Sequence, residues 1–302
     1  MLYFVIANLS LINDMYQYSL EFFTRLFKMR LEKSEQSDEV EKRLIILIDD
    51  ITKNFYLSIC RGLFERDKLL YSFLNTAQIL MRGNKISFEE WNCFLRGSPT
   101  DFKDKENKAS DILDNKMWIA LWGLEESHAN FKDITNSVCD VGDKPIWKEI
   151  IKSETPWTVD LPAVYEARLT PFQKTMLINV LKKTKLMGSV KEFVRAEVGA
   201  FYIESPPFDL EGCLEDSSNI TPIIFVLSPG ADPIAYLTAL AVSKGMDKKL
   251  RTISLGQGQD VIAEKLIEEG SRAGDWICLQ NCHLFTSWMG KLEMIQEKAD
   301  AN

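Results

Sequence analysis

Hydrophobic residues recur at gaps of three and four through residues 1–97, the spacing of helices with one apolar face. Polar capping residues and glycines divide this region into four predicted helices. They are Tyr16 to Leu31 behind Asn13 or Asp14, Leu44 to Ile59 behind the capping pair Asp38 and Glu41 and closed by Gly62, Leu69 to Met81 closed by Gly83, and Phe88 to Leu95 behind the pair Ser87 and Glu90 and closed by Gly97.

The pattern is less regular over residues 98–165. The stretch SPTDFKDKENKAS, residues 98–110, mixes charge with Pro, Asn and Ser and predicts a linker. A tryptophan-rich helix follows over residues 112–122, and we interpret its aromatic side chains as core packing because they bury the most area per residue. Two more capped helix starts are predicted at Thr170 with Gln173 and at Ser189 with Glu192, the second helix ending at Gly199.

Short apolar runs alternate with helices from residue 220 onward, which predicts parallel βαβ units. The first run is continuously apolar and is typical of a strand buried on both faces. The fold class is therefore α/β, a helical N-terminal region followed by a partial, P-loop-like parallel sheet with flanking helices. The predicted strands are Pro222–Leu227, Leu250–Leu255 and Trp276–Gln280, and the predicted helices are Ile234–Ser243, Val261–Ala273 and Ser287–Lys298.

The turn after the first predicted strand is placed like a phosphate-binding loop, yet it lacks the residues that hold a nucleotide. A P-loop, GxxxxGK[ST], uses a lysine for the phosphates and a hydroxyl for Mg²⁺, and neither is present. Two prolines remove N–H donors, and one aspartate puts a negative charge where a polyanion would sit. The turn consists of Ser228, Pro229, Gly230, Ala231, Asp232 and Pro233.

The third predicted strand ends in Gln280 and Asn281, where an active NTPase would carry an acidic pair. Without those carboxylates nothing orients Mg²⁺ or the attacking water. We therefore expect no catalytic residues, no bound nucleotide and no cofactor in this chain. The rival interpretation of an active P-loop NTPase module would require the missing lysine and acidic pair.

Two other clusters could carry chemistry. Residues 256–259, GQGQ, precede a helix, but they do not complete GxGxxG, so we favour a tight turn with Asp260 as helix cap over a dinucleotide-binding α/β domain. Cys278, Cys282 and His283 lie within six residues of one another, but Cys278 lies inside an apolar strand and no second cysteine pair completes a zinc site. We expect no metal there.

Amino-acid composition excludes further classes of protein. Lys plus Arg is 36 against 44 for Asp plus Glu, a net charge of −8, which argues against a general nucleic-acid binder. The apolar runs are too short for a membrane span of about 20 residues, so we expect no membrane partner. Six dispersed cysteines without a disulfide-framework spacing indicate reduced thiols.

Several long motifs, in order, resemble a segment of a dynein heavy chain. The N-terminal motifs are similar to the segment that leaves the fifth AAA+ module and to the helices that lead into the sixth. The later motifs resemble the core of the sixth module, and their amino-acid sequence is more similar to axonemal than to cytoplasmic dyneins. These motifs are LYFVIANLSLINDMYQYSLEFFTRLF, CRGLFERDKLLYSF, LTPFQKTMLINVLK, FYIESPPFDL, TPIIFVLSPGADP, ISLGQGQ and WICLQNCHL.

The resemblance implies three parts: residues 1–97 leaving the fifth AAA+ module, a linker and Trp-rich segment over 98–165, and a degenerate sixth module core over 166–302. It implies a structural, nucleotide-free piece of a minus-end-directed microtubule motor of the axoneme of cilia and flagella, located in the cytoplasm and cytoskeleton. ATP and Mg²⁺ would act at other modules.

The partners implied are neighbouring AAA+ modules, dynein intermediate and light chains, and microtubules. The resemblance also implies a fourth strand beyond Asn302, between the strand at 222–227 and the one at 276–280. Residues 223–227 are then expected to lack strand partners in this chain.

Overall fold

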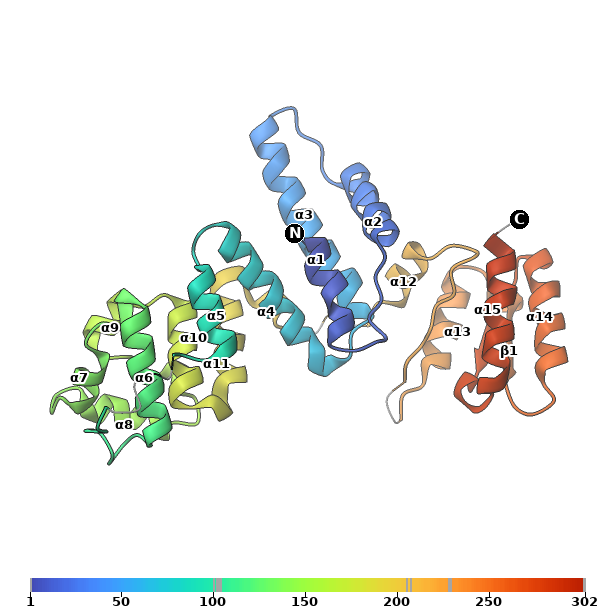
Figure 1. The fold of residues 1–302 in the computed structure, drawn as a ribbon. Helices are drawn as coiled ribbons and strands as arrows, with labels where there is room; N and C mark the ends of the chain where they lie inside the picture. The colour runs from blue at the N-terminus through green and yellow to red at the C-terminus, as the bar shows by residue number, and fades with distance from the viewer. Residues whose placement is uncertain are drawn as a thin grey trace. The chain divides into compact units, whose positions relative to one another are not determined.

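The chain forms two compact units, residues 1–206 and 207–302, in a computed structural model that describes residues 2–99, 101, 105–204, 206, 208–227 and 230–300. The first unit is built from helices, and the second combines helices with a two-stranded sheet (Figure 1). No helix in the described part of the chain is long and apolar enough to cross a membrane.

The first unit is entirely helical within the described residues. Its elements are α1 (Leu2–Ala7), η1 (Asn8–Leu11), α2 (Leu20–Lys33), α3 (Val40–Arg61), α4 (Glu65–Arg82), α5 (Phe88–Arg96), α6 (Asn115–Ser127), η2 (Ala129–Phe131), α7 (Ile134–Cys139), α8 (Lys144–Lys152), η3 (Pro156–Thr158), α9 (Ala163–Arg168), α10 (Pro171–Leu181), η4 (Lys183–Lys185), α11 (Leu186–Val198) and η5 (Ala200–Tyr202).

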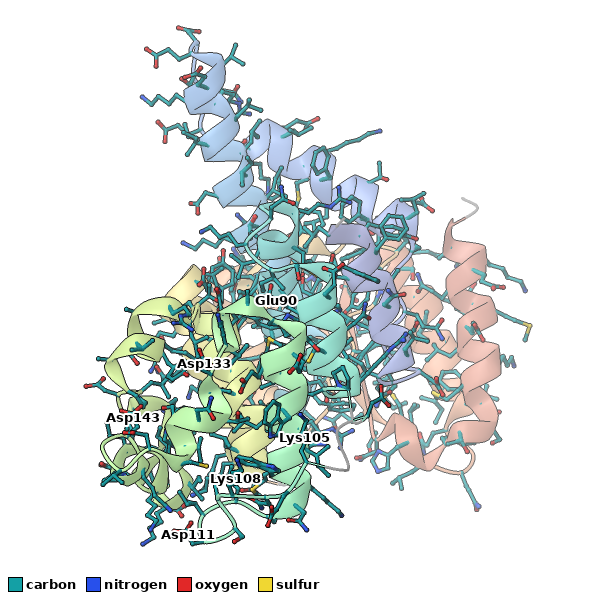
Figure 2. The ribbon with its side chains drawn as sticks, turned by 60° about the vertical axis from the view of Figure 1, so that its left-hand side comes forward. Glu90, Lys105, Lys108, Asp111, Asp133 and Asp143 are labelled. Atoms are coloured by element: carbon teal, nitrogen blue, oxygen red, sulfur yellow. The ribbon has the colours of Figure 1, made fainter. Side chains whose placement is uncertain are left out.

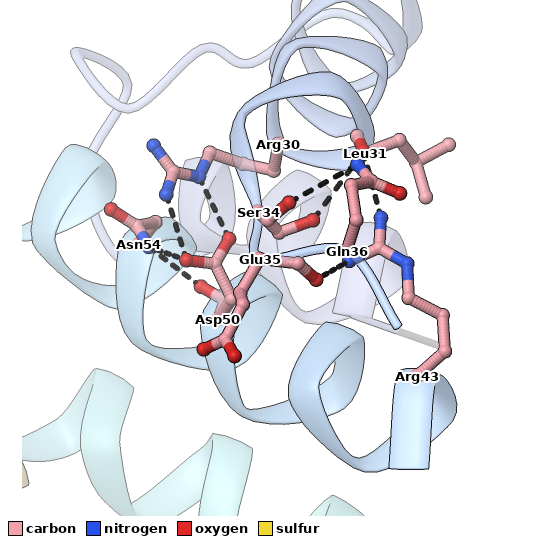
Figure 3. Close-up of polar contacts among 8 residues, drawn as sticks. All are labelled: Arg30, Leu31, Ser34, Glu35, Gln36, Arg43, Asp50 and Asn54. Carbon is pink, nitrogen blue, oxygen red and sulfur yellow. Dashed lines mark hydrogen bonds and ion pairs between the residues drawn. The ribbon is translucent and has the colours of Figure 1, made fainter. Parts of the chain in front are cut away.

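Helices α2 and α3 form an antiparallel hairpin held by charged groups (Figure 3). The Arg30 guanidinium donates two hydrogen bonds to the Asp50 carboxylate, at 2.9 and 2.8 Å. Asn54 donates to the carbonyl and the carboxylate of the same aspartate. At the connection, Arg43 donates to the carbonyls of Leu31, at 2.9 Å, and Glu35, so the last turn of α2 is satisfied by a side chain of α3.

Two hydrophobic cores lie within the first unit. One joins α1, η1, α2, α3 and the start of α4, and the other joins the end of α4 with α5 to α11. The first core contains a buried polar contact, because the Tyr16 hydroxyl donates to Asp67 at 2.6 Å and accepts from the Phe64 amide at 3.0 Å. The second is centred on fully buried side chains such as Trp118, Trp147 and Phe131.

Helix α4 belongs to both cores, since Tyr71 packs in the first and Phe73 and Leu80 in the second. A second contact joins residues that lie far apart in the sequence of the unit. The Tyr56 hydroxyl on α3 lies within hydrogen-bond distance of the carbonyls of Tyr202, at 3.1 Å, and Glu204, at 3.4 Å.

The second unit contains a two-stranded parallel sheet, as the sequence predicts. The register pairs Leu250 with Trp276 and Ser254 with Gln280. A small core around Leu255, Ala263 and Trp288 holds α14 and α15 to the strands. The elements are α12 (Leu210–Asp216), α13 (Pro233–Ser243), η6 (Asp247–Lys249), β1 (Leu250–Ser254), α14 (Asp260–Ala273), β2 (Trp276–Gln280), η7 (Cys282–Leu284) and α15 (Thr286–Asp300).

The capping pairs predicted at Ser87 with Glu90 and at Thr170 with Gln173 are confirmed as complete capping boxes, which start α5 and α10. Three other predicted starts are wrong. Ser19, not Asn13 or Asp14, caps α2. Helix α3 begins without a side-chain cap, because Arg43 already fixes the connection from α2.

The third wrong start is at Ser189, which lies inside α11 and is buried. Its hydroxyl is 3.3 Å from that of Thr175 on α10, so helix packing uses the group that a cap would need. The predicted ends at Gly62, Gly83, Gly97 and Gly199 are confirmed.

Helix α6 packs closely against the chain that follows α5. A Cβ added at Gly123 would lie 2.4 Å from the Pro99 carbonyl oxygen and 2.7 Å from the Ser98 Cβ. We predict that Gly123→Ala destabilises the first unit by about 1–3 kcal/mol, because backbone has to move to admit the methyl group. Urea denaturation followed by tryptophan fluorescence measures this loss.

Gly83→Ala is the matched control. Gly83 has a φ of −78°, and its added Cβ would meet carbonyl oxygens only at 3.6 and 3.7 Å. We expect a change within about 0.5 kcal/mol for this control. Equal stability of the Gly123 and Gly83 variants would contradict the close approach.

His128 gives the first unit a predicted pH dependence. Burial lowers the pKa of His128 from its ordinary 6.5, against an opposing effect of the Glu90 and Glu89 charges. Its Nε2 is buried and has no hydrogen-bond partner among the described residues. Glu90, labelled in Figure 2, is already engaged by the Gln173 amide at 2.6 Å and the Ser87 N–H at 2.7 Å.

Because the folded pKa lies below the unfolded one, the unfolded chain binds more protons as pH falls through 6.5. We therefore predict that the first unit loses stability on acidification from pH 8 to 5.5, and that His128→Gln loses less. Urea denaturation at both pH values tests this. His283→Gln, in the second unit, is the control for removing an imidazole, and an identical pH profile for wild type and His128→Gln would refute the prediction.

Candidate functional site

The segment predicted as the first strand does not form one. Residues 222–227 carry no strand in the structure, which corrects the prediction for Pro222–Leu227. A strand is defined by hydrogen bonds to a neighbour, and β1 and β2 pair only with each other in the described part of the chain. The side chains of Ile224 and Val226 are 80% and 63% exposed, so the expected burial on both faces is also absent.

Helix α13 begins at the predicted turn, and Asp232 occupies its N-terminus. The Asp232 carboxylate accepts hydrogen bonds from the backbone N–H groups of Ile234, at 3.1 Å, and Ala235, at 3.4 Å. Pro233 has no N–H to offer at the first helical position. The backbone donors that a phosphate would use at a helix N-terminus are therefore already bound to a carboxylate.

The other residues of the turn contribute less. Gly230 has a φ of +82°, a conformation suited to glycine. Ala231, exposed, adds no polar side chain. The predicted residues Ser228 and Pro229 lie outside the described residues.

The carboxyl ends of β1 and β2 are joined by neutral side chains. Asn281 lies just after β2 in the left-handed region, with φ of +59°, and its amide donates to the Ser254 hydroxyl at 2.9 Å. The Gln280 carbonyl accepts from the Leu255 N–H at 2.9 Å. The structure thus brings Gln280 and Asn281 to the sheet edge where the sequence places them, with no acidic pair there.

The Ser254–Asn281 bridge was missed from the sequence. One signal for it exists, since asparagine is enriched at positive φ and directly follows the apolar strand. Its partner on β1 carries no such signal. Together, these groups offer hydrogen bonds but no carboxylate that could bind the Mg²⁺ of a nucleotide.

The GQGQ loop leads into α14, which starts at Asp260 with Gln259 as its N-cap and no side-chain capping bond. The expectation that Asp260 is the cap is therefore wrong. The loop is ordered instead by a backbone turn, in which the Gln259 N–H donates to the Gly256 carbonyl at 3.1 Å. Asp260 lies in the first turn, where its charge still favours the helix N-terminus.

Cys278 and Cys282 lie on β2 and η7. The Cys282 thiol donates to the Leu279 carbonyl at 3.5 Å, and burial raises the pKa of the Cys278 thiol. Within the described ranges, no three or more His, Cys, Asp or Glu side chains are arranged to hold a metal ion. The absence of a metal at Cys278, Cys282 and His283 stays a prediction.

Comparison with known proteins matches residues 218–302 to the dynein heavy chain region D6 P-loop domain. The chain is 37% identical to dynein axonemal heavy chain 3 of Mus musculus over 298 residues, 98% of this chain and 7% of the relative. It is 36% identical to the dynein-1-beta heavy chain, flagellar inner arm I1 complex, of Chlamydomonas reinhardtii over 298 residues, 98% of this chain and 6% of the relative.

The chain belongs to the dynein heavy chain family. It spans about 7% of the length of its relatives, so it corresponds to one segment of a heavy chain. The D6 match begins at residue 218 and covers the turn, β1, β2 and α15, which confirms the resemblance to a partial AAA+ α/β core.

Hydrogen exchange tests the state of residues 223–227. Among the described residues their N–H groups have no backbone acceptor, whereas β1 and β2 form a paired ladder. We predict that amides 223–227 exchange much faster than those of residues 252–254 and 277–279, because unpaired amides need no opening event before exchange. Protection of 223–227 equal to that of β2 would show that the segment is a paired strand in solution.

Proposed function

We propose that this chain is a structural, nucleotide-free AAA+ module segment of a dynein heavy chain. The observation that carries the proposal is the occupied N-terminus of α13, where Asp232 accepts the backbone donors that a phosphate would need. A phosphate there would also meet the aspartate's like charge, which is unfavourable at short range.

The strand ends support the same conclusion. Phosphoryl transfer depends on carboxylates that orient Mg²⁺ and the attacking water, and Gln280 and Asn281 supply amides in their place. The Asn281 amide is engaged by Ser254. Asp260 is the carboxylate that follows the GQGQ loop. It lies in the first turn of α14, where a negative charge stabilises the helix N-terminus.

The wider role follows from the family. The parent protein would be an ATP-driven, minus-end-directed microtubule motor of the axoneme of cilia and flagella, within the cytoskeleton, with ATP and Mg²⁺ at other modules. The segment would contact neighbouring AAA+ modules of the same heavy chain. Intermediate and light chains and microtubules would be partners of the whole motor.

A covering segment from a longer heavy chain would also account for the exposed apolar surface of the second unit. Helix α13 is almost wholly apolar, yet Tyr236 and Val242 are each 62% exposed and only Ala241 is buried. A helix with apolar residues all round is typical of one covered on several sides. The fourth AAA+ strand implied by the family resemblance would lie between residues 222–227 and β2.

Isothermal titration with Mg-ATP tests the proposal. We expect no saturable heat, because no described group offers both phosphate donors and a Mg²⁺ ligand. Saturable binding at micromolar concentration, about −8 kcal/mol at 1 μM, would overturn it. Titration with NAD is the parallel experiment for the dinucleotide interpretation of the GQGQ loop, and Asp232→Asn is the control that removes the opposing charge while keeping a capping side chain.

A further inference from the structure

A groove of about 360 Å³ opens in the first unit between α3, α4 and the α11–η5 connection. Phe55, in the C-terminal half of α3, packs on Phe23 of α2, with ring centroids 4.9 Å apart. Nearer the start of α3, Ile45 and Ile48 are 70% and 67% exposed. These two side chains form one apolar wall of the groove.

The other walls are also apolar near the surface. Ile79 of α4, 40% exposed, lines the groove together with Val198 of α11 and Tyr202 of η5. Isoleucines exposed on two helices that face a shared hollow are unlike the scattered single apolar residues found on most surfaces. The groove is therefore suited to hold an apolar segment.

Its floor is polar. The buried hydroxyls of Ser72 and Thr76 donate to the carbonyls of Lys68, at 3.1 Å, and Ser72, at 2.8 Å, and Ser72 is also a hydrogen-bond neighbour of the Tyr56 hydroxyl. The Asn75 amide lies beside the Tyr71 hydroxyl. The floor is therefore largely engaged within the unit.

One carboxylate completes the lining. Asp49 is exposed on the α3 side of the groove and forms no ion pair within the described part of the chain. It acts on Tyr202 across the groove, where burial raises the pKa of the tyrosine and the Asp49 charge adds to the rise. The groove therefore combines apolar walls with a polar floor and one negative charge.

We propose that this groove binds a protein helix that presents a lysine or arginine between apolar residues. The long aliphatic stem of either side chain would pack on Ile45, Ile48 and Ile79, and the cationic head would donate to Asp49. A wholly apolar helix would leave Asp49 without a cationic partner. An anionic helix would meet the charge of Asp49.

This interaction goes beyond the nucleotide-free role and is independent of it, since the groove lies on unit-one helices and the nucleotide loop lies in the second unit. The two can fail separately. Mg-ATP titration reports on the loop, and peptide binding reports on the groove.

The test uses the 302-residue protein and two fluorescein-labelled amphipathic peptides held helical by a side-chain staple. The peptides are identical except that one carries lysine and the other norleucine at the central position of the apolar face. By fluorescence anisotropy we expect the lysine peptide to bind about threefold more tightly, a difference of about 0.7 kcal/mol, as for an ion pair with an exposed carboxylate. The difference should shrink as salt is raised, because Asp49 is exposed.

Variants locate the binding. Asp49→Asn should abolish the preference for lysine, whereas Glu41→Gln, an exposed acidic site on α3 outside the groove lining, should leave it unchanged. Ile48→Ser should weaken both peptides and, because Ile48 is exposed, leave the unfolding midpoint in place.

Binding of neither peptide, equal binding of both, or an equal loss in Asp49→Asn and Glu41→Gln would overturn the proposal. So would sedimentation showing two copies of the chain that separate in Ile48→Ser, since the groove would then be a self-association surface.

Discussion

The first unit depends on α4, because one helix has to satisfy three different surroundings at once. Tyr71 faces the N-terminal core, Phe73 and Leu80 face the larger core, and Ile79 faces the groove. An α-helix can present three faces because successive residues are rotated by about 100°. Helix α4 packs directly on α1 and on α11.

A different constraint governs the second unit. A polar group there that already holds a hydrogen bond within the fold is not free to bind a nucleotide. Helix N-termini attract anions, and in α13 the anion is supplied by the chain itself through Asp232. At the sheet edge the same limit applies to Asn281, whose amide is bound to Ser254. The loop keeps the outline of a nucleotide-binding turn while its polar groups are committed to holding the fold.

Sequence alone predicts elements whose signal is local. The capping boxes at Ser87 and Thr170 and the ladder of β1 with β2 need only neighbouring residues or strong apolar runs, and the structure confirms them. The prediction fails where distant groups decide. Arg43 fixes the start of α3 through α2, Ser189 is buried by α10, and residues 222–227 have the composition of a strand without a partner to pair with.

The bond between the Tyr56 hydroxyl and the Tyr202 carbonyl joins residues 146 positions apart. Such a contact forms slowly, because a long loop must close before the bond repays the lost chain entropy. During synthesis, α3 would pack with α1, α2 and the start of α4 as these emerge, whereas the tie to residues 202 and 204 can form only after the other helices of the unit have been made. The N-terminal core can therefore form first, and the closure of the unit through Tyr56 comes last.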